Sequence, residues 1–459
     1  MAGSISGGVN LTPSSKKVIQ PNNYINDFDF LNQYLPDTYE KEFERYGNRS
    51  IASFLRAVSA ELPSNSDLIK WAEQGRLHTQ YTGITAGTFT TGQQVFNIAS
   101  GTCVFRVGQT VMLSSATDTA TKKGIITAVS GTAFTVAYYT NETTAPFTAT
   151  STTDVVAFVY GSEFKKGTAG MSDSLEAESD IFENSPIIIK DKYEVSGSDM
   201  AQIGWVEVTT ENGATGYLWY VKSEHETRLR FEDYLEMSMI EGIPAVDGPA
   251  NSAFDQGYKG TEGMFYAIEN RGNVWGGGYP ESLTEFDTIV QQLDKQGSIQ
   301  ENVIFLNREF NFAVDDMLAA QNNFGSSGTS FGLFDNDENM ALNLGFTGFK
   351  RGYEFYKSDW KYLNDPTLRG GLTDEKVYGV LVPAGSMTVY DQVLGKNATR
   401  PFLHVRYRAS ETEDRRYKTW ITGSAGGAAT SDLDAMEVHF LSERALCTMG
   451  ANNFFIFKD

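Results

Sequence analysis

Cysteine is almost absent from the chain, since only Cys103 and Cys447 occur among its 459 residues. Two cysteines this far apart do not build the disulfide framework of a secreted domain, so we expect a reducing compartment. No stretch approaches the ~18 consecutive apolar residues that a membrane-spanning helix requires. The residues after Met1 also lack the basic start and the apolar run of a signal peptide. These absences predict a soluble protein without membrane association or Sec-dependent export.

Basic residues are also scarce, because 37 Lys and Arg stand against 58 Asp and Glu, for a formal net charge of −21 at pH 7. Binding to phosphate groups needs clustered Lys and Arg, so this balance disfavours a protein that reads DNA or adheres to anionic membranes. An acidic surface is compatible with a container whose wall must not stick to the DNA packed inside it.

The motifs of catalytic and metal sites are incomplete in this sequence. His225 opens the H-E-x-x-H pattern of a zinc site, but Leu229 stands where the second His is needed. Asp335–Asn339 begins like a calcium loop, yet Met340 and Phe346 replace its Gly and its bidentate Glu. The sequence also has no Walker loop and no G-x-S-x-G elbow. We therefore assign no catalytic residue, metal ligand or cofactor site, and we expect no enzyme.

Two strand-like runs followed by a long helical pattern form the most informative part of the sequence. Ile187–Val195 and Ile203–Thr209 are rich in β-branched and aromatic residues, which favours strands. Tyr217–Glu241 then repeats apolar residues near the helical period. Gly242 fits a left-handed C-terminal cap, and Pro244 prevents the helix from continuing. A helix of this span would be ~37 Å long and could serve as the backbone of a flat domain.

The N-terminal part of the chain has two sections. Residues 1–36 have the Gly, Ser, Asn and Pro content of an extended arm, which usually becomes ordered only against a neighbour. Residues 37–82 are expected to form short helices, among them Ile51–Glu61 and a helix that is capped by Ser66 and carries Trp71.

Residues 83–167 differ from both flanks, because Thr, Gly, Val and Ala alternate there in short runs separated by turn signals. This pattern predicts a small all-β domain, a barrel or a sandwich, inserted into the chain. Strands are expected at Val104–Val107, Thr110–Leu113, Gly124–Val129, Ala133–Tyr139 and Val155–Tyr160.

Residues 245–395 have an α/β pattern. Ser282 and Glu285 form a capping box that opens a helix, and Gly297 stops it. The final residues, 396–459, return to strand patterns.

Two stretches of like charge are the candidate inter-subunit contacts. The acidic stretch contains Asp173, Glu176, Glu178, Asp180 and Glu183. The basic stretch contains Arg406, Arg408, Arg415, Arg416 and Lys418. In a monomer each would be a solvated face, whereas in a closed assembly complementary patches fix the register between subunits. We hypothesise that the two stretches meet across a subunit contact.

Three local segments, taken with the order of the parts, carry a resemblance to a known family. The segments are Asn184–Gly197, Lys222–Glu241 and Ala445–Phe457. The chain resembles the major capsid proteins of tailed bacteriophages (Caudoviricetes), which have the Hong Kong 97-type fold, and it is most similar to those of crAss-like phages. The inserted β domain departs from the minimal plan of that family.

The resemblance implies an α+β fold with an N-terminal arm, an extended loop, a spine helix with a peripheral β-sheet, and an α/β axial domain. On this plan the parts are the arm 1–36, the N-terminal helical segment 37–82, the inserted β domain 83–167, the extended loop 168–212, the spine helix 213–244, the axial domain 245–395 and the return strands 396–459 of the peripheral domain.

The resemblance also implies a function. The chain would be the major capsid subunit of a virion, assembling in the bacterial cytoplasm into hexamers and pentamers of an icosahedral head around double-stranded DNA. Expected partners are other copies of the chain together with portal, scaffolding and auxiliary, decoration or head-fibre proteins. The alternative is a tail, baseplate or fibre component, which the long helix followed by an α/β middle disfavours.

Overall fold

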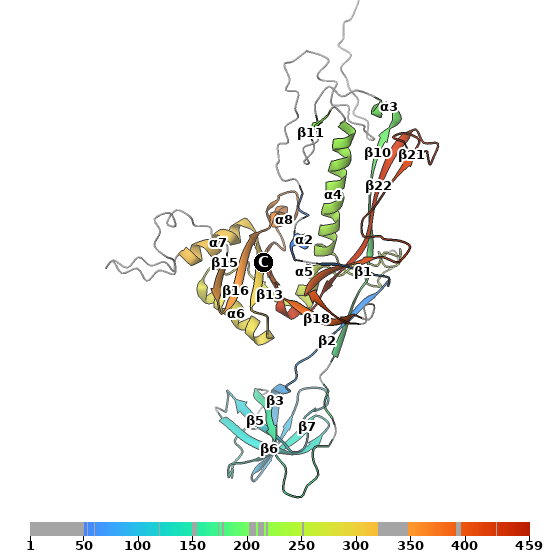
Figure 1. The fold of residues 1–459 in the computed structure, drawn as a ribbon. Helices are drawn as coiled ribbons and strands as arrows, with labels where there is room; N and C mark the ends of the chain where they lie inside the picture. The colour runs from blue at the N-terminus through green and yellow to red at the C-terminus, as the bar shows by residue number, and fades with distance from the viewer. Residues whose placement is uncertain are drawn as a thin grey trace, which may run out of the picture. The chain divides into compact units, whose positions relative to one another are not determined.

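The chain has a mixed α+β fold in the computed structural model (Figure 1). The structure describes residues 50–52, 54–58, 60–118, 120–148, 154–172, 174–176, 179–201, 208–209, 215–216, 219–249, 252–319, 348–391, 396–427 and 429–459. Two compact units are present. One unit comprises residues 1–69 and 183–459, and the other comprises residues 70–182.

The first sheet of the larger unit is organised around one long strand, β22 (Ala435–Thr448). Strand β10 (Ile187–Ser196) pairs antiparallel along one edge of β22. The other edge pairs first with β21 (Lys418–Gly423) and then with β20 (Leu403–Arg408). Strand β1 (Ala60–Ser64) completes the sheet by pairing in parallel with β20. Both edges of β22 are therefore occupied over most of its length.

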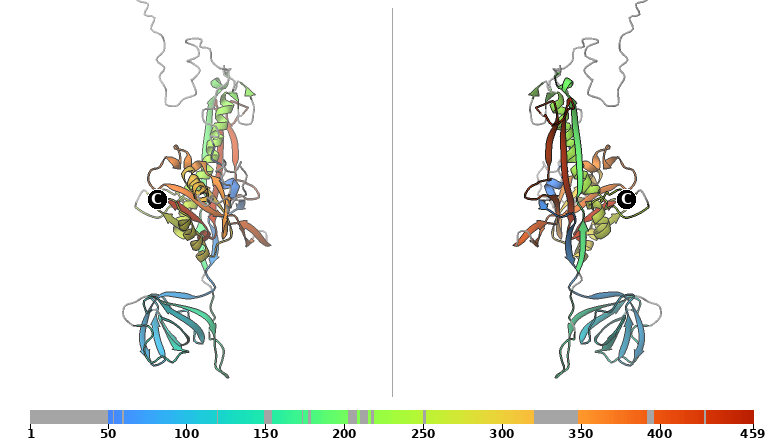
Figure 2. Two further views of the ribbon diagram at one scale, coloured as in Figure 1. Left: turned by 90° about the vertical axis from the view of Figure 1, so that its left-hand side faces the viewer. Right: turned by 90° about the vertical axis from the view of Figure 1, so that its right-hand side faces the viewer.

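The long helix α4 (Trp219–Glu241) confirms the predicted helix and lies along β10 and β22 (Figure 2). Phe231 and Leu235 are buried against Val195 of β10 and Phe440 of β22. The rings of Phe231 and Phe440 lie 5.7 Å apart. The apolar face of α4 is thus covered by the long strands, which stabilises both elements.

Gly242 ends α4 for a different reason from the one expected. Its φ is not positive, so the left-handed cap is absent. A Cβ at this position would lie 2.6 Å from the carbonyl oxygens of Ser238 and Thr261. Glycine is therefore required here by the close approach of the following loop, not by backbone conformation.

The second sheet of the larger unit has six strands. Their order is β13 (Asn273–Gly276), β23 (Phe455–Lys458), β17 (Val377–Pro383), β14 (Glu301–Leu306), β16 (Tyr353–Asp359) and β15 (Gly348–Arg351). Both faces are buried, as the alternation in β23 illustrates. Phe455 and Phe457 pack with the helices on one face, and Ile456 packs into the core on the other.

Two helices cover the first of these faces, α6 (Leu283–Gln296) and α7 (Arg308–Ala319). The capping box predicted for α6 is confirmed, because Ser282 and Glu285 exchange both of its hydrogen bonds. Gly297 follows in the left-handed conformation with φ of 70°.

The opposite face belongs to a core that joins the two sheets. It contains the end of α4, the helix α5 (Met264–Arg271), the short helix α2 (Phe54–Val58) and Leu446 of β22. Phe54 of α2 stacks on Trp360 with ring centroids 4.3 Å apart. Because one core serves both sheets, they form a single folded unit.

The smaller unit contains a closed barrel. Its strands, in the order in which they pair, are β3 (Gln80–Thr90), β4 (Gln93–Asn97), β7 (Ala133–Tyr138), β6 (Ala120–Ser130), β5 (Gln109–Ser115) and β8 (Val155–Ser162). The barrel has a core of its own, in which Phe96, Phe134 and Phe147 are fully buried. Closure leaves this sheet without a free edge.

The helices expected over residues 37–82 are largely wrong within the part that the structure describes. Only Phe54–Val58 is helical, and Ala60–Ser64 is strand β1 at the edge of the first sheet. Pro63 explains the change, because a proline ends a helix before it but is tolerated in an edge strand. The helix expected after Ser66 is strand β2 (Ile69–Gln74), which pairs with β9 (Ser179–Asn184).

Asn184 links three segments of the larger unit. Its side chain is 4% exposed, and its Nδ2 donates to the carbonyl oxygens of Leu446 at 2.7 Å and Glu262 at 3.0 Å. Its Oδ1 accepts from the backbone N of Glu262 at 2.7 Å and from Oγ1 of Thr261 at 3.1 Å. One buried amide thus satisfies backbone groups of β22 and of the loop before α5.

We expect Asn184→Ala to destabilise the larger unit by on the order of 3 kcal/mol, because buried backbone groups lose their partners. Asn184→Asp should destabilise at least as strongly, since it turns a carboxylate toward two carbonyl oxygens. Calorimetric unfolding of the full chain measures both. Asn97→Ala, at an exposed strand position, is the control, and equal effects at the two positions would contradict the assignment.

Candidate functional site

Carboxylates of α4 hold the segment that carries α2. Oδ1 of Asp233 accepts from Oγ of Ser50 at 2.9 Å and from the backbone N of Ile51 at 2.8 Å. Oε1 of Glu236 accepts from the backbone N of Phe54 at 3.2 Å. The first backbone N–H groups of a helix have no partner within that helix, so these carboxylates cap α2 from outside.

Glu236 is an unusual member of this group because it is only 3% exposed. The pKa of Glu236 is raised to about 8, chiefly by burial and to a smaller extent by the neighbouring Asp233 carboxylate, while the N–H groups of Phe54 and Leu55 act in the opposite direction. Burial also raises the pKa of Asp233. At neutral pH Glu236 is therefore mostly protonated and accepts its backbone hydrogen bond as a neutral acid.

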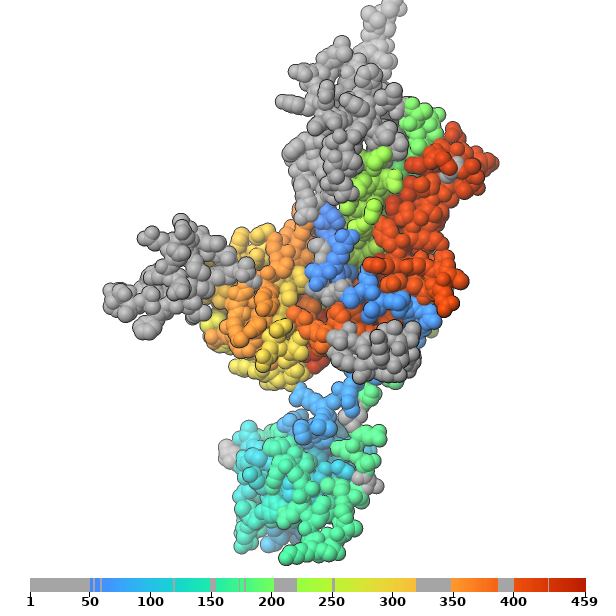
Figure 3. All heavy atoms as spheres, viewed as in Figure 1, coloured from blue at the N-terminus to red at the C-terminus, as the bar shows by residue number. Residues whose placement is uncertain are grey.

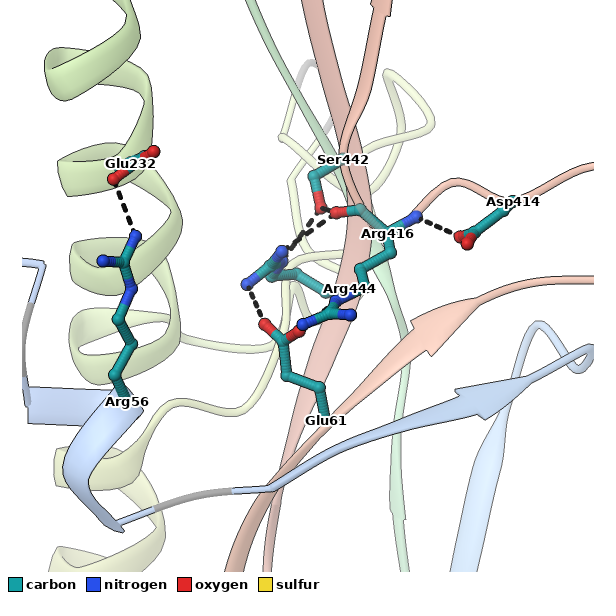
Figure 4. A network of polar contacts seen from close by, with 7 residues as sticks. All are labelled: Arg56, Glu61, Glu232, Asp414, Arg416, Ser442 and Arg444. Carbon is teal, nitrogen blue, oxygen red and sulfur yellow. Dashed lines mark hydrogen bonds and ion pairs between the residues drawn. The ribbon is translucent and has the colours of Figure 1, made fainter.

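A second cluster joins β1 to β22. Arg444 is 6% exposed, and its guanidinium contacts Oε1 of Glu61 at 3.3 Å, Oγ of Ser442 at 2.9 Å and the carbonyl oxygen of Arg416 at 3.0 Å. The Arg416 side chain pairs with the same Glu61. Figure 4 shows these residues converging between β1 and the strands of the C-terminal part. A buried guanidinium is costly unless it is paired, so this cluster fixes where β1 docks.

The two clusters lie around one cavity of about 700 Å³ between α2, α4, β1 and the first sheet. The space-filling view shows the blue segment after residue 50 lying against green α4 and the red C-terminal strands (Figure 3). The lining consists of Arg56, Arg228, Arg416 and Arg444, the acids Glu61, Glu232, Glu236 and Asp414, and Ala52, Leu55, Leu235, Val405 and Tyr417.

The charges around this cavity are paired across elements. Arg56 of α2 contacts Glu232 of α4 at 2.7 Å, as Figure 4 shows. Asp414 accepts from the backbone N of Arg416 at 2.8 Å. The chemistry of the site is therefore ion pairing and hydrogen bonding, and its effect is to hold residues 50–64 between the long helix and the sheet.

The basic residues singled out in the sequence have carboxylate partners within their own unit. Arg408 and Arg415 both contact Glu443, at 3.6 and 2.8 Å, and Arg408 also pairs with Asp67. Lys418 pairs with Glu413 at 2.5 Å. Arg416 lines the cavity, and Arg406 lies on β20. Arg408, Arg415, Arg416 and Lys418 thus belong to intramolecular ion pairs that sequence reasoning did not anticipate.

The acidic stretch is described only in part. Glu176, Asp180 and Glu183 are exposed, the last two on β9. Asp173 and Glu178 lie outside the described residues. Among the described residues, the carboxylates that pair with Arg408, Arg415, Arg416 and Lys418 are Asp67, Glu443, Glu61 and Glu413, which do not belong to the acidic stretch.

The capping carboxylates of α4 are the functional residues that sequence reasoning missed. Asp233 and Glu236 are three residues apart on α4, and Glu236 stands between Leu235 and Met239 on the buried side of the helix. A carboxylate that interrupts an apolar stripe in this way is a signal for a buried partner.

The structure also locates His225, one of the two incomplete metal motifs of the sequence, and it describes helices that can be examined for membrane spans. Within the described ranges, no group of three or more His, Cys, Asp or Glu side chains could hold a metal ion. His225 lies half-buried on α4, and Asp335–Asn339 falls outside the described residues. Every helix of the described part is too short or too polar to span a lipid bilayer.

Comparisons with known proteins identify similar solved structures only. No family model and no curated protein match the chain. A structure from Microbacterium phage Oxtober96 is 9% identical, with 92% of this chain and 96% of that chain covered and a TM-score of 0.40. A structure from Mycobacterium phage Ogopogo is 10% identical, with 95% of this chain and 100% of that chain covered and a TM-score of 0.40. A chain from the capsid of a native GTA particle is 9% identical, with 95% of this chain and 99% of that chain covered and a TM-score of 0.39. Likeness this slight does not transfer a function to this chain.

The capping role of Glu236 gives a pH-dependent prediction. Because its pKa is about 8 in the folded chain and near its ordinary value when unfolded, the folded state binds more protons between about pH 4.5 and 8. Stability should therefore fall as pH rises through that window, by on the order of a few kcal/mol. Glu236→Gln keeps the oxygen that accepts from Phe54 and removes the titration.

We therefore expect Glu236→Gln to lose less stability than the unchanged chain between pH 5 and 8, measured by urea unfolding. Some loss should remain because the pKa of Asp233 is also raised. Glu232→Gln is the control, since Glu236 still titrates in that variant. Identical pH dependence in the unchanged chain and Glu236→Gln would contradict the assignment.

Proposed function

We propose that the chain is a structural subunit of a bacteriophage virion, the major capsid protein of a tailed phage with a Hong Kong 97-type fold. In this proposal it assembles into hexamers and pentamers of an icosahedral head that encloses double-stranded DNA. The crAss-like phages are the group to which we assign it, on the sequence resemblance described above.

One observation carries the proposal, namely the frame formed by α4 with β10 and β22. A 23-residue helix lies on a strand of 14 residues, and a shared core joins this layer to a six-stranded sheet covered by two helices. In the proposed plan α4 is the spine helix, the first sheet is the peripheral sheet, and the second sheet is the axial domain. The net charge of −21 supports it too, since such a wall repels packed DNA.

The remaining assignments follow the same plan. Residues 1–36 would be the arm, and residues 168–212 the extended loop that reaches a neighbour. The barrel would be an insertion into that plan. Besides other copies of the chain, the proposed partners are portal, scaffolding and auxiliary or head-fibre proteins, met during assembly in the host cytoplasm.

The acidic and basic stretches remain our proposed subunit contact, with one change of detail. Arg408, Arg415, Arg416 and Lys418 already have carboxylate partners in the same chain. A neighbour's acidic stretch would therefore exchange with or extend these pairs. The pairs of Arg408 with Asp67, Arg416 with Glu61 and Lys418 with Glu413 are partly exposed and typically contribute below about 1 kcal/mol, so an exchange at these three residues costs little.

Electron microscopy of the purified or coexpressed full chain tests the proposed function. We expect closed shells, because ring contacts between identical subunits close when the subunits adopt slightly different curvatures. Tubes or fibres would support a tail or fibre component instead. A dispersed monomer under all assembly conditions would contradict both.

The charge contact has its own test. We expect Arg415→Glu/Arg416→Glu to reduce shell yield, and Glu176→Lys/Asp180→Lys to do the same, because each places like charges against the neighbour. A mixture of the two variants should recover shells, since one contact between them is complementary again. Sedimentation measures the yield, and calorimetry checks that each variant is folded. Failure of the acidic reversal to affect yield would contradict the contact.

A further inference from the structure

The barrel has an aromatic face that its fold does not explain. Tyr139, Phe158, Tyr160 and Phe164 are 50, 40, 48 and 42% exposed, although the barrel already has a complete core of other residues. Large apolar side chains gathered on one surface of a soluble domain usually mark a contact with another molecule. The face needs a partner that the described chain does not supply.

Strand register brings Phe158 and Tyr160 of β8 beside β5 and β6. Met112 of β5 pairs with Lys123 of β6 on one side and with Phe158 of β8 on the other. Nζ of Lys123 lies 5.6 Å from the centre of the Tyr160 ring. The backbone N of Tyr139 donates to the carbonyl oxygen of Lys123 at 3.2 Å, which places Tyr139 at the same site.

The polar groups of this face have both signs. Oη of Tyr139 donates to Oε2 of Glu163 at 2.5 Å, and Lys123 stands over the ring of Tyr160. Phe164 follows Glu163 and packs against Gly108, where a Cβ would meet its ring at 2.7 Å. The face therefore combines four rings, one ammonium group and one carboxylate.

The net charge of the barrel is compatible with a second copy of the chain as the partner of the aromatic face. Residues 80–168 contain five Lys and Arg (Arg106, Lys122, Lys123, Lys165 and Lys166) and four acids (Asp118, Glu142, Asp154 and Glu163), a net charge of +1. The whole chain carries −21, so two copies repel each other over most of their surfaces. The barrel strands and their loops therefore carry almost no net charge, so a contact between two barrels meets little electrostatic repulsion.

We propose that the aromatic face is a self-contact, through which the barrels of two copies pair about a two-fold axis. A two-fold contact joins the same patch on both copies, so it requires a self-complementary surface. This face meets the requirement, because its rings pack against rings and Lys123 of each copy meets Glu163 of the other. The proposal deepens the proposed function, on which it rests for the setting in which copies meet.

The size of the face decides how strong the contact is. A buried aromatic side chain covers about 150–250 Å², so the exposed parts of four rings supply on the order of 400 Å² per copy. The total lies below the area of a stable binary complex, which is about 1,200 Å² or more. The contact is therefore weak in a single pair and becomes effective when many subunits hold their barrels in place.

A single introduced thiol tests the self-contact in the full chain. Both native cysteines are buried, at 6 and 2% exposed, so Phe158→Cys supplies one reactive thiol at the centre of the face. One thiol per chain can be joined only to the same position of another copy, by oxidation or by a short bis-maleimide. Asn97→Cys is the matched control, exposed on β4 and outside the strands of the face.

Among assembled shells we expect covalent dimers of Phe158→Cys to exceed those of Asn97→Cys by about tenfold, because only the first pair of thiols is brought within disulfide distance. Tyr160→Cys is a second reporter at the same face and should behave alike. Shells in which neither reporter forms more dimer than the control overturn the self-contact and leave the proposed function standing.

The two proposals fail separately. If the chain forms no shells, the proposed function fails, and the cross-link is then measured on the concentrated dispersed chain. Dimers above the Asn97→Cys control support the self-contact there, and their absence overturns it. If the aromatic side chains are shielded from solvent in shells but no cross-link forms, a different surface covers the face. That result also overturns the self-contact.

Discussion

The pairing of β22 on both of its edges is the constraint on which the larger unit depends. All but two of its 14 residues are buried, and it is bound by β10 on one side and by β21 and then β20 on the other. A slip of one residue would move every side chain of β22 to the opposite face and misalign its pairs with β10, β21 and β20, so the register is strongly fixed. Helix α4 packs on this layer, and the chain continues from β22 into β23 of the second sheet. The frame thus determines where the other elements attach.

Ion pairs and buried carboxylates then decide how the N-terminal segment joins the frame. Apolar burial alone would let residues 50–64 lie in several positions. The ion pair of Arg444 with Glu61 and the hydrogen bonds from α2 and the residues before it to the α4 carboxylates form in only one of these positions. Such groups add specificity more than stability, because their desolvation offsets much of their attraction.

The elements with strong local signals were predictable from the sequence. The long helix, the capping box at Ser282 and the barrel strands Thr110–Leu113 and Val155–Tyr160 have periodicity or end signals that act locally. Val104–Val107 was wrongly expected to be a strand, since the backbone N of Val104 donates to Oη of Tyr81 outside any strand pairing. The strand at residues 60–64 was missed because it forms by pairing with β20, which lies more than 300 residues away in the sequence.

The candidate site was less predictable, because its charges act through distant contacts. The sequence identified Arg415 and Arg416 as a basic stretch, but their partners Glu443 and Glu61 are set by strand pairing. Likewise the burial of Glu236 depends on α2, which comes from a segment 182 residues earlier. Such neighbours carry no pattern that a local reading of the chain can detect.

Hydrogen exchange of the full chain, measured unassembled and assembled, tests the central claim that the subunit is built on a preformed frame. We expect the amides of β10, β22 and the buried side of α4 to be the slowest of the larger unit in both states, because their ladder opens only when that unit unfolds. Fast exchange of these amides in the unassembled chain, with protection gained only on assembly, would contradict the account.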